Sequence, residues 1–198
     1  MADLKEIKGR IQSIKSTQKI TSAMMMVSSA KLRKAQNIFQ NLLPYQQKLT
    51  ELMHVFLHNE ELPPIPYTAE REVKRVVLIA FSSDSSLCGR FNQNINDKLK
   101  DVVKSWSHLG KEHIMVYPIG DKVAKAAKEM DVTVAGDFSY MSDNPTYKEA
   151  DKIASKLMES FVKGEIDRVE LIYHHFKSRG TQLITHEAFL PITLEPKG

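Results

Sequence analysis

The segment Arg75-Val76-Val77-Leu78-Ile79-Ala80-Phe81 decides the fold class of this chain. It is a continuous apolar run rich in β-branched residues, which is typical of a strand buried on both faces of a parallel sheet. A loop with four serines and one glycine follows over residues 82–90, and a helical pattern follows over residues 91–107. The segment therefore opens a strand–loop–helix unit.

Strand and helix patterns continue to alternate after this unit. We expect Asn144 to cap the last helix and Pro145 to be its first residue. Repeated strand–helix units predict an α/β fold: a Rossmann-like, doubly wound sheet of about five strands with helices on both faces and a hairpin of the last two strands at one edge. The further strands are predicted over residues 113–117, 132–135, 168–176 and 181–190, and the further helices over 121–130 and 145–162.

Upstream of the proline cluster at 63–66, the hydrophobic period is that of a coiled coil. Apolar residues occupy twelve of the sixteen heptad a and d positions between Leu4 and Phe56. This pattern predicts one long N-terminal coiled-coil helix, roughly 80 Å long if it is continuous. The expected organisation is a shaft helix over 1–59, a linker over 60–74 and a Rossmann-like domain over 75–198.

Two features disturb the apolar seam of the predicted helix. Gln18, Thr21 and Ser28 place polar groups in its middle, and Pro44 is expected to bend or break the helix near Asn41. A 3.5-residue stripe requires a partner helix, because it would otherwise face water. No heptad run of comparable length follows residue 60, so the partner is expected to come from outside this sequence.

Positive charge is concentrated in the predicted helix. The net charge of the chain is +4, but residues 1–59 hold nine basic and three acidic residues, a net charge of +6, and the rest of the chain carries −2. Such a helix could bind nucleic acid electrostatically. Phe39 and Tyr45 are the only aromatic residues interleaved with its basic residues, and the seam requires a protein partner. An acidic protein groove is therefore a better candidate for the binding partner of this helix than DNA.

Composition excludes several other classes of protein. No apolar run approaches the ~18–20 residues that cross a bilayer, and the start lacks the features of a signal or transit peptide. A single cysteine, Cys88, allows no intramolecular disulfide and no four-cysteine zinc site. We therefore expect a cytosolic, bacterial chain.

The loop after the first strand is the position where an α/β sheet would bind a nucleotide. It has one glycine and lacks the G-x-G-x-x-G pattern, and no G-x-x-x-x-G-K-[ST] pattern occurs in the chain. Asp84 and Ser86 begin a metal-binding pattern whose third position is Cys88. We interpret the loop as a tight turn and Cys88 as a buried thiol rather than a nucleophile.

Histidines and methionines offer three further candidates. His54 and His58 have metal-ligand spacing, but only Glu60 or Glu61 lies nearby as a third ligand, so a solvated or interface pair is expected. His174 and His175 fall on opposite faces of one strand and cannot form one site. The run Met24-Met25-Met26 predicts an adaptable contact surface for several partners.

Three motifs in this chain resemble those of one protein family. They are Leu4-Lys5-Glu6-Ile7-Lys8-x-Arg10-Ile11, the stretch from Ser16 to Val27 followed by Ala30 to Gln36, and Ser86-Leu87-Cys88-Gly89-Arg90-Phe91-Asn92. In this order they are similar to the gamma subunit of the F-type ATP synthase.

This resemblance implies a central-stalk rotor that couples ion flow to ATP synthesis or hydrolysis, without catalytic residues, cofactor or metal of its own. Its implied partners are the alpha and beta subunits, the epsilon subunit and the membrane c-ring, at the cytoplasmic face of the bacterial inner membrane. Carried over by motif, the residues expected to face the alpha/beta ring are Lys19, Met24, Met25, Lys31, Arg33 and Lys34.

Family members continue beyond the last strand into a second shaft helix, whereas this sequence ends at Gly198. We therefore expect the N-terminal helix to find a substitute partner, such as a second copy of the chain. The alternative interpretation is a Rossmann-type nucleotide-binding domain or enzyme with a coiled-coil arm.

Overall fold

The computed structural model describes residues 2–57, 65–143 and 145–193. The chain divides into two compact units, Met1–Leu62 and Pro63–Gly198, and each is described by itself.

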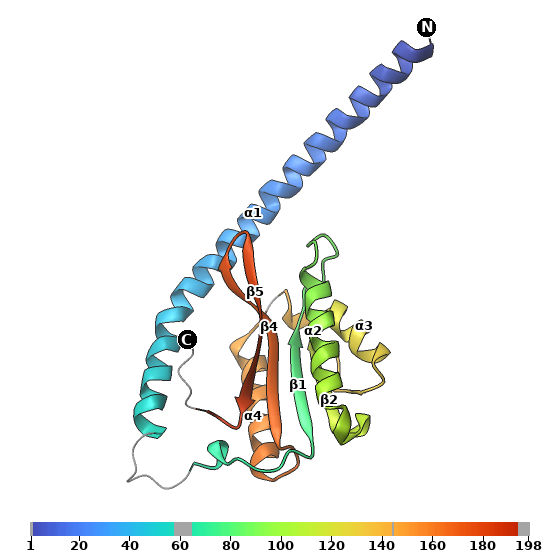
Figure 1. Ribbon diagram of the computed structural model, residues 1–198. Coiled ribbons are helices and arrows are strands. Elements are labelled where there is room, and N and C mark those ends of the chain that lie inside the picture. Colours follow the sequence, from blue (N-terminus) through green and yellow to red (C-terminus); the bar gives the residue numbers. More distant parts are fainter. Residues whose placement is uncertain (1, 58–64, 144, 194–198) are drawn as a thin grey trace. The chain divides into compact units, whose positions relative to one another are not determined.

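The first unit is a single helix, α1 (Ala2–Leu57), 56 residues long (Figure 1). Good helix formers fill most of its positions, and Asp3 in the first turn complements the helix dipole. The prediction of one long helix is confirmed, although residues 58 and 59 lie outside the described part of the chain.

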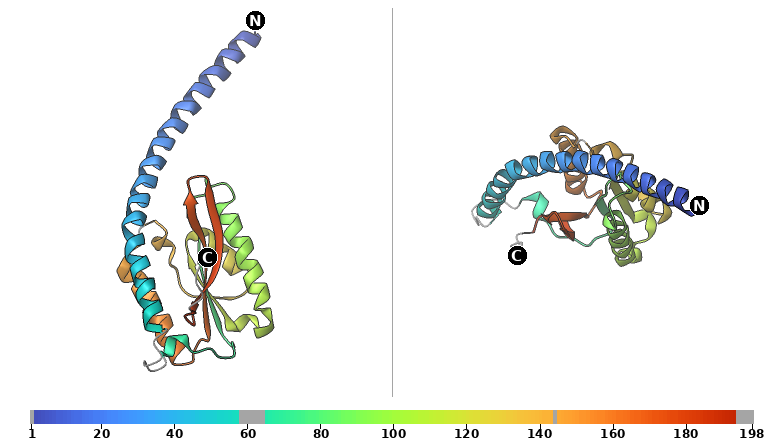
Figure 2. Two further views of the ribbon diagram at one scale, coloured as in Figure 1. Left: turned by 60° about the vertical axis from the view of Figure 1, so that its left-hand side comes forward. Right: turned by 90° about the horizontal axis from the view of Figure 1, so that it is seen from above.

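Pro44 does not break this helix. It lies inside α1, where it removes one backbone donor and places its ring near the carbonyl of the preceding turn. The helix accommodates this by continuing along a curved path, which both views of Figure 2 show. Of the two outcomes expected near Asn41, a bend or a break, the break does not occur, and the helix runs through Pro44 without interruption.

The second unit is built on a five-stranded sheet. Its strand order is β3-β2-β1-β4-β5; the first four of these strands are parallel, and β5 runs antiparallel to β4 at one edge. The predicted doubly wound sheet and its edge hairpin are confirmed. The strands are β1 (Val76–Phe81), β2 (Ile114–Ile119), β3 (Thr133–Val134), β4 (Arg168–Ser178) and β5 (Thr181–Leu190).

Helices cover both faces of the sheet (Figure 1). On one face, α2 (Phe91–Ser105) and α3 (Asp121–Glu129) pack on alternate residues of β1, among them Val76 and Leu78. On the other, α4 (Tyr147–Val162) packs on Val77 and Ile79. The apolar run at 76–81 contributes side chains to both cores, as expected for a strand buried on both sides. The short 3₁₀ turns are Pro66–Thr68, Ser107–Leu109, Lys111–His113 and Ser139–Met141.

Residues 65–74, which we expected to belong to a linker, are bound to the α/β unit. The 3₁₀ turn Pro66–Thr68 opens this segment, and the carbonyl of Tyr67 accepts a hydrogen bond of 2.8 Å from the amide of Ile192. Tyr67 also packs against the core beneath α4. This segment is therefore an ordered strap that leads into β1.

The start of α4 differs from the prediction. Thr146 is the N-cap: its hydroxyl accepts from the amide of Glu149 at 3.3 Å and donates to the Glu149 carboxylate at 2.9 Å. The two residues have the spacing of a capping box, with the Glu149 carboxylate bound to the Thr146 hydroxyl instead of the Thr146 backbone amide. Pro145 therefore lies outside the helix, and Asn144 lies outside the described residues.

Candidate partner-binding surface of the long helix

The apolar seam of α1 is open to solvent in this chain. Leu4 and Ile14 are 66% and 67% exposed, and Ile7 and Ile11 are exposed as well. A fully buried side chain of this size contributes roughly 1.5–3 kcal/mol, so a partner helix laid along the seam would gain several such contributions. The seam is thus a surface on which another helix could pack.

Thr21, one of the three polar residues of the seam, and its neighbour Thr17 outside the seam have their hydroxyls bound within the helix itself. The hydroxyl of Thr17 donates to the carbonyl of Ser13 at 3.0 Å, and that of Thr21 donates to the carbonyl of Thr17 at 2.9 Å. Each hydroxyl is satisfied within its own helix, which leaves the methyl groups to meet a partner. The shallow groove here is lined by Ser13, Ile14, Thr17, Gln18, Thr21, Ser22 and Met25.

Apolar side chains surround the helix at the methionine run. Met24, Met25 and Met26 are 49%, 64% and 65% exposed, and Ile20 and Val27 are exposed beside them. Because consecutive helical residues point in different directions, these side chains cover every side of one turn. A surface of this kind suits contact with protein on several sides at once.

The basic residues predicted to face a partner form no ion pair with any described residue. Two ion pairs within α1 join other residues: Arg10 to Glu6 at 2.7 Å and Lys48 to Glu51 at 2.6 Å. The charge of the unpaired cations is therefore available to an acidic surface elsewhere. These cations are Lys19, Lys31, Arg33 and Lys34.

At the carboxyl end of β1, the candidate nucleotide site is filled by the chain itself. The Asp84 carboxylate accepts from the amide of Asp121 at 2.8 Å and from the Ser142 hydroxyl, and the Ser82 hydroxyl accepts from the amide of Val123 at 3.0 Å. These bonds cap the N-terminus of α3.

The loop after β1 is fixed in the same way to the start of α2. The buried side chain of Asn92 accepts from the amide of Ser83 at 2.9 Å and donates to the carbonyl of Ser85 at 2.8 Å. Amides that would bind a phosphate at this edge thus donate to side chains of the protein. This geometry supports the interpretation as a structural turn and speaks against the nucleotide-binding alternative.

Cys88 is half-buried rather than fully buried, with its Sγ 3.2 Å from Nδ2 of Asn92. No group of three potential metal ligands occurs among the described residues, and His58 lies outside them. His174 stacks on Phe91 with ring centroids 4.1 Å apart, and burial lowers the pKa of His174.

Sequence reasoning missed a buried charge cluster on the α2 face of the sheet. Glu170 is 3% exposed, and its carboxylate accepts from Arg168 Nε at 2.6 Å and Trp106 Nε1 at 3.1 Å, with His186 Nε2 at 2.8 Å. Burial alone would raise the pKa of Glu170, but these partners outweigh it and lower the pKa to about 2. The available signal was an acidic residue between Val169 and Leu171 in a buried strand pattern.

Comparison with known proteins identifies the family. The family described as ATP synthase matches residues 3–197. A curated ATP synthase gamma chain from Bacteroides thetaiotaomicron is 50% identical over 98% of this chain and 65% of its own length, and one from Flavobacterium johnsoniae is 42% identical over 97% and 66%. The chain thus spans about two thirds of the length of these relatives.

A solved structure supports the fold. The central stalk and c-ring structure of the Tetrahymena thermophila mitochondrial ATP synthase contains a chain that matches 87% of this one, with 72% of its own length covered, a TM-score of 0.59 and 22% identity. Since the sequence match runs through both units and half of the aligned residues are identical to those of a curated relative, this chain belongs to the ATP synthase gamma-chain family.

Proposed function

We propose that the chain acts as the rotor subunit of the central stalk of an F-type ATP synthase. In this role α1 is the shaft that turns inside the ring of alpha and beta subunits, and the α/β unit is the foot. The subunit catalyses nothing itself; it couples ion flow through the membrane sector to ATP synthesis or hydrolysis by rotation. Membership of the gamma-chain family supports this proposal.

The observation that carries the proposal is the surface of α1. A 56-residue helix presents an open apolar seam, an apolar girdle at Met24–Met26 and cations that no described residue pairs. A helix this long with such a surface gains stability from tertiary packing rather than from propensity. A stiff helix enclosed by protein is also what a shaft requires.

We assign the contacts with the alpha/beta ring to six residues of α1. Their side chains combine positive charge, which suits acidic levers on the ring, with flexible thioethers, which tolerate different neighbours as the shaft turns. The six residues are Lys19, Met24, Met25, Lys31, Arg33 and Lys34.

The foot is proposed to bind the epsilon subunit and the c-ring at the cytoplasmic face of the bacterial inner membrane. The likeness to a chain from the central stalk and c-ring structure of the Tetrahymena thermophila enzyme motivates this placement. Within the part of the chain that the structure describes, no helix combines the length and apolar character needed to cross a bilayer. Attachment through partner subunits requires none.

Co-assembly tests the proposal directly. Tagged beta subunit and alpha subunit from Bacteroides thetaiotaomicron, whose gamma chain is 50% identical to this one, are co-expressed with the chain. We expect the chain to elute with the alpha/beta hexamer, and a bead attached to the foot to rotate on addition of ATP. Elution apart from the hexamer, together with micromolar binding of ATP or NAD to the chain alone, would support the nucleotide-binding alternative instead.

A further inference from the structure

We propose that Arg71 and Asp167 form the mechanical junction through which force carried by the strap before β1 enters the sheet. We call these two side chains and their hydrogen bonds the Arg71–Asp167 clamp. The inference rests on the proposed rotor function, because only a turning shaft has torque to pass to its foot.

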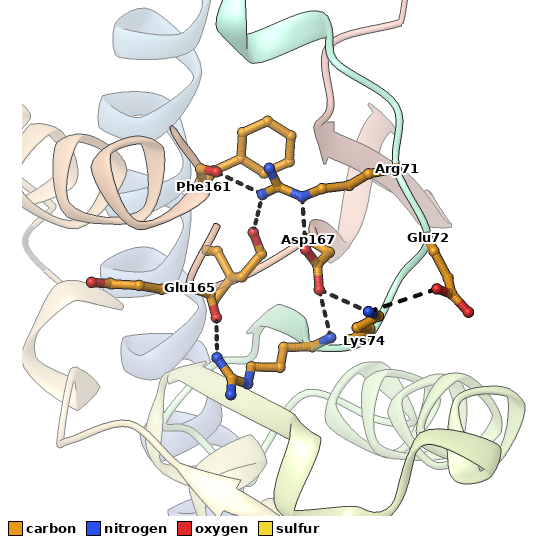
Figure 3. Close-up of polar contacts among 8 residues, drawn as sticks. Arg71, Glu72, Lys74, Phe161, Glu165 and Asp167 are labelled. Carbon is orange, nitrogen blue, oxygen red and sulfur yellow. Dashed lines mark hydrogen bonds and ion pairs between the residues drawn. The ribbon is translucent and has the colours of Figure 1, made fainter. Parts of the chain in front are cut away.

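The clamp lies where two central strands begin. Arg71 belongs to the strap, five residues before β1 starts at Val76, and Asp167 immediately precedes β4, which starts at Arg168. Because β1 and β4 are parallel neighbours, paired from Val76 and Arg168 onward, their N-terminal ends lie side by side at the same end of the sheet. Figure 3 shows the side chains that gather there.

Arg71 binds three successive parts of the chain beyond the strap. Its Nε donates to Oδ1 of Asp167 at 2.7 Å, and its Nη2 donates to the carbonyls of Phe161 at 2.6 Å and Ile166 at 2.5 Å. The guanidinium also lies 4.4 Å from the centre of the fully buried Phe161 ring. One planar cation thus holds the last turn of α4, the α4–β4 loop and the start of β4 together.

Asp167 completes the clamp from the other side. Its second oxygen accepts from the amides of Lys74 and Arg75, each at 2.9 Å, and its own amide donates to the carbonyl of Arg75 at 2.9 Å. Burial would raise the pKa of Asp167, but these amides and the Arg71 guanidinium outweigh it and lower the pKa. The carboxylate is therefore charged, and both of its oxygens accept hydrogen bonds.

The arrangement decides how a pull on the strap is shared. Upstream of the clamp, the strap is bound through the packing of Tyr67 and its single backbone bond with Ile192. A pull that passes this point reaches Arg71 and divides among α4, the α4–β4 loop and β4. Without Arg71, the same pull would act on the backbone bonds that join Lys74 and Arg75 to Asp167, and then on the first pairs of the β1 ladder.

An exposed ion pair in the same strap provides the matched control. Glu72 and Lys74 approach to 3.8 Å with side chains 84% and 75% exposed. A surface pair of this kind contributes little, so Glu72→Gln changes charge in the strap without touching the clamp. Arg71→Met removes the clamp's cation, and the milder Arg71→Lys keeps the charge but lacks the planar fork of donors.

Single-molecule pulling on the whole chain tests the junction in two directions. Cysteines in a Cys88→Ser background attach handles at positions 8 and 128, so that force passes through the strap, or at 128 and 148, so that it does not. At a given force through the strap, we expect Arg71→Met to unfold at least about tenfold faster than the parent, with Arg71→Lys in between. Between 128 and 148 the change should stay below about twofold, and Glu72→Gln should match the parent in both directions. Equal acceleration in both directions would overturn the proposal, since the clamp would then be an ordinary stabilising contact.

The assembled ATP synthase containing this chain tests the consequence. We expect Arg71→Met to leave ATP hydrolysis unchanged while roughly halving the ions pumped per ATP, with Glu72→Gln unchanged. An unchanged pumping ratio in Arg71→Met would overturn the role of the clamp in coupling. If the unsubstituted chain itself supports no rotation, the rotor function is refuted instead, and the pulling data separate the two failures.

Discussion

Nε2 of His186 on the edge strand β5 lies 2.8 Å from Oε2 of Glu170 on β4. The same carboxylate is bound by Arg168 of β4 and by Trp106 at the end of α2. An uncompensated charge at a site only 3% exposed would cost several kcal/mol. Because the buried charge of Glu170 must be compensated by these partners, the edge hairpin and α2 are held in one register against β4.

We expect Glu170→Gln to destabilise the α/β unit and to flatten its response to acid. Because the pKa of Glu170 falls from 4.5 to about 2 on folding, its contribution is complete above pH 4.5 and is lost as the pH falls toward 2. The variant should lose roughly 3 kcal/mol of unfolding free energy at pH 7. Its stability should also change less than that of the parent between pH 4.5 and 2. Urea unfolding followed by circular dichroism across this range measures both effects.

Glu112→Gln is the control for this experiment, because the Glu112 side chain is 75% exposed. It should leave stability within about 0.5 kcal/mol of the parent at pH 7. A Glu170→Gln protein with the acid response of the parent would show that the cluster does not hold the carboxylate charged.

At Gly120 the backbone leaves no room for a side chain. It adopts a φ of 110°, and a Cβ there would lie 2.4 Å from the carbonyl oxygen of Ser82. We expect Gly120→Ala to cost about 2–4 kcal/mol of unfolding free energy, from strain and from displacement of the loop that caps α3. Gly164→Ala is the matched control, since its φ is also positive at 74° but a Cβ would meet nothing within 4 Å. It should cost about 1 kcal/mol, and equal losses in the two variants would contradict the steric argument.

Elements with a strong hydrophobic period could be predicted from the sequence. The run from Val76 to Phe81 indicated a strand buried on both sides, and the heptad ladder indicated one long helix; the structure has both. Pro44 does not break the helix, because a single proline removes only one of many backbone bonds and the neighbouring turns keep the helix continuous. The T-x-x-E spacing of Thr146 and Glu149 also marks a helix start in the sequence, but the Asn144–Pro145 pair beside it gives a competing signal.

Long-range polar contacts could not be predicted in the same way. Arg71 and Asp167 are separated by 96 positions, and Glu170 meets Trp106 across 64. Neither pairing leaves a periodic trace, because each arises only when the sheet brings distant strand ends or faces together. The candidate nucleotide site at the carboxyl end of β1 could be predicted only in part. The missing glycine pattern speaks against a bound phosphate, but the capping of α3 by Asp84 depends on the topology of the sheet.

Charge reversal on α1 tests the proposed contact with the alpha/beta ring. We expect the triple change Lys31→Glu, Arg33→Glu, Lys34→Glu, made in the assembled enzyme, to reduce ion pumping per ATP by about tenfold, because like charges would then face the acidic levers. The charge-conserving swap Lys31→Arg, Arg33→Lys, Lys34→Arg is the control and should stay close to the parent. Coupled pumping measured in membrane vesicles, with hydrolysis measured in parallel, separates coupling from turnover. Coupling that survives the reversal would remove these three residues from the contact.

The open seam of α1 predicts that the isolated chain associates with itself. Ile11 and Ile14 lie on the heptad ladder and are 48% and 67% exposed, whereas Ile20 lies off the ladder and is 62% exposed. A second copy would bury the ladder, since apolar area leaves water only when two seams meet. Sedimentation equilibrium should therefore show a concentration-dependent dimer for the parent and for Ile20→Glu. The double change Ile11→Glu, Ile14→Glu should give a monomer, because carboxylates would be buried at the seam. A parent chain that sediments as a strict monomer while its circular dichroism shows a fully helical α1 would refute the association, since the seam would then be stable in water without a partner.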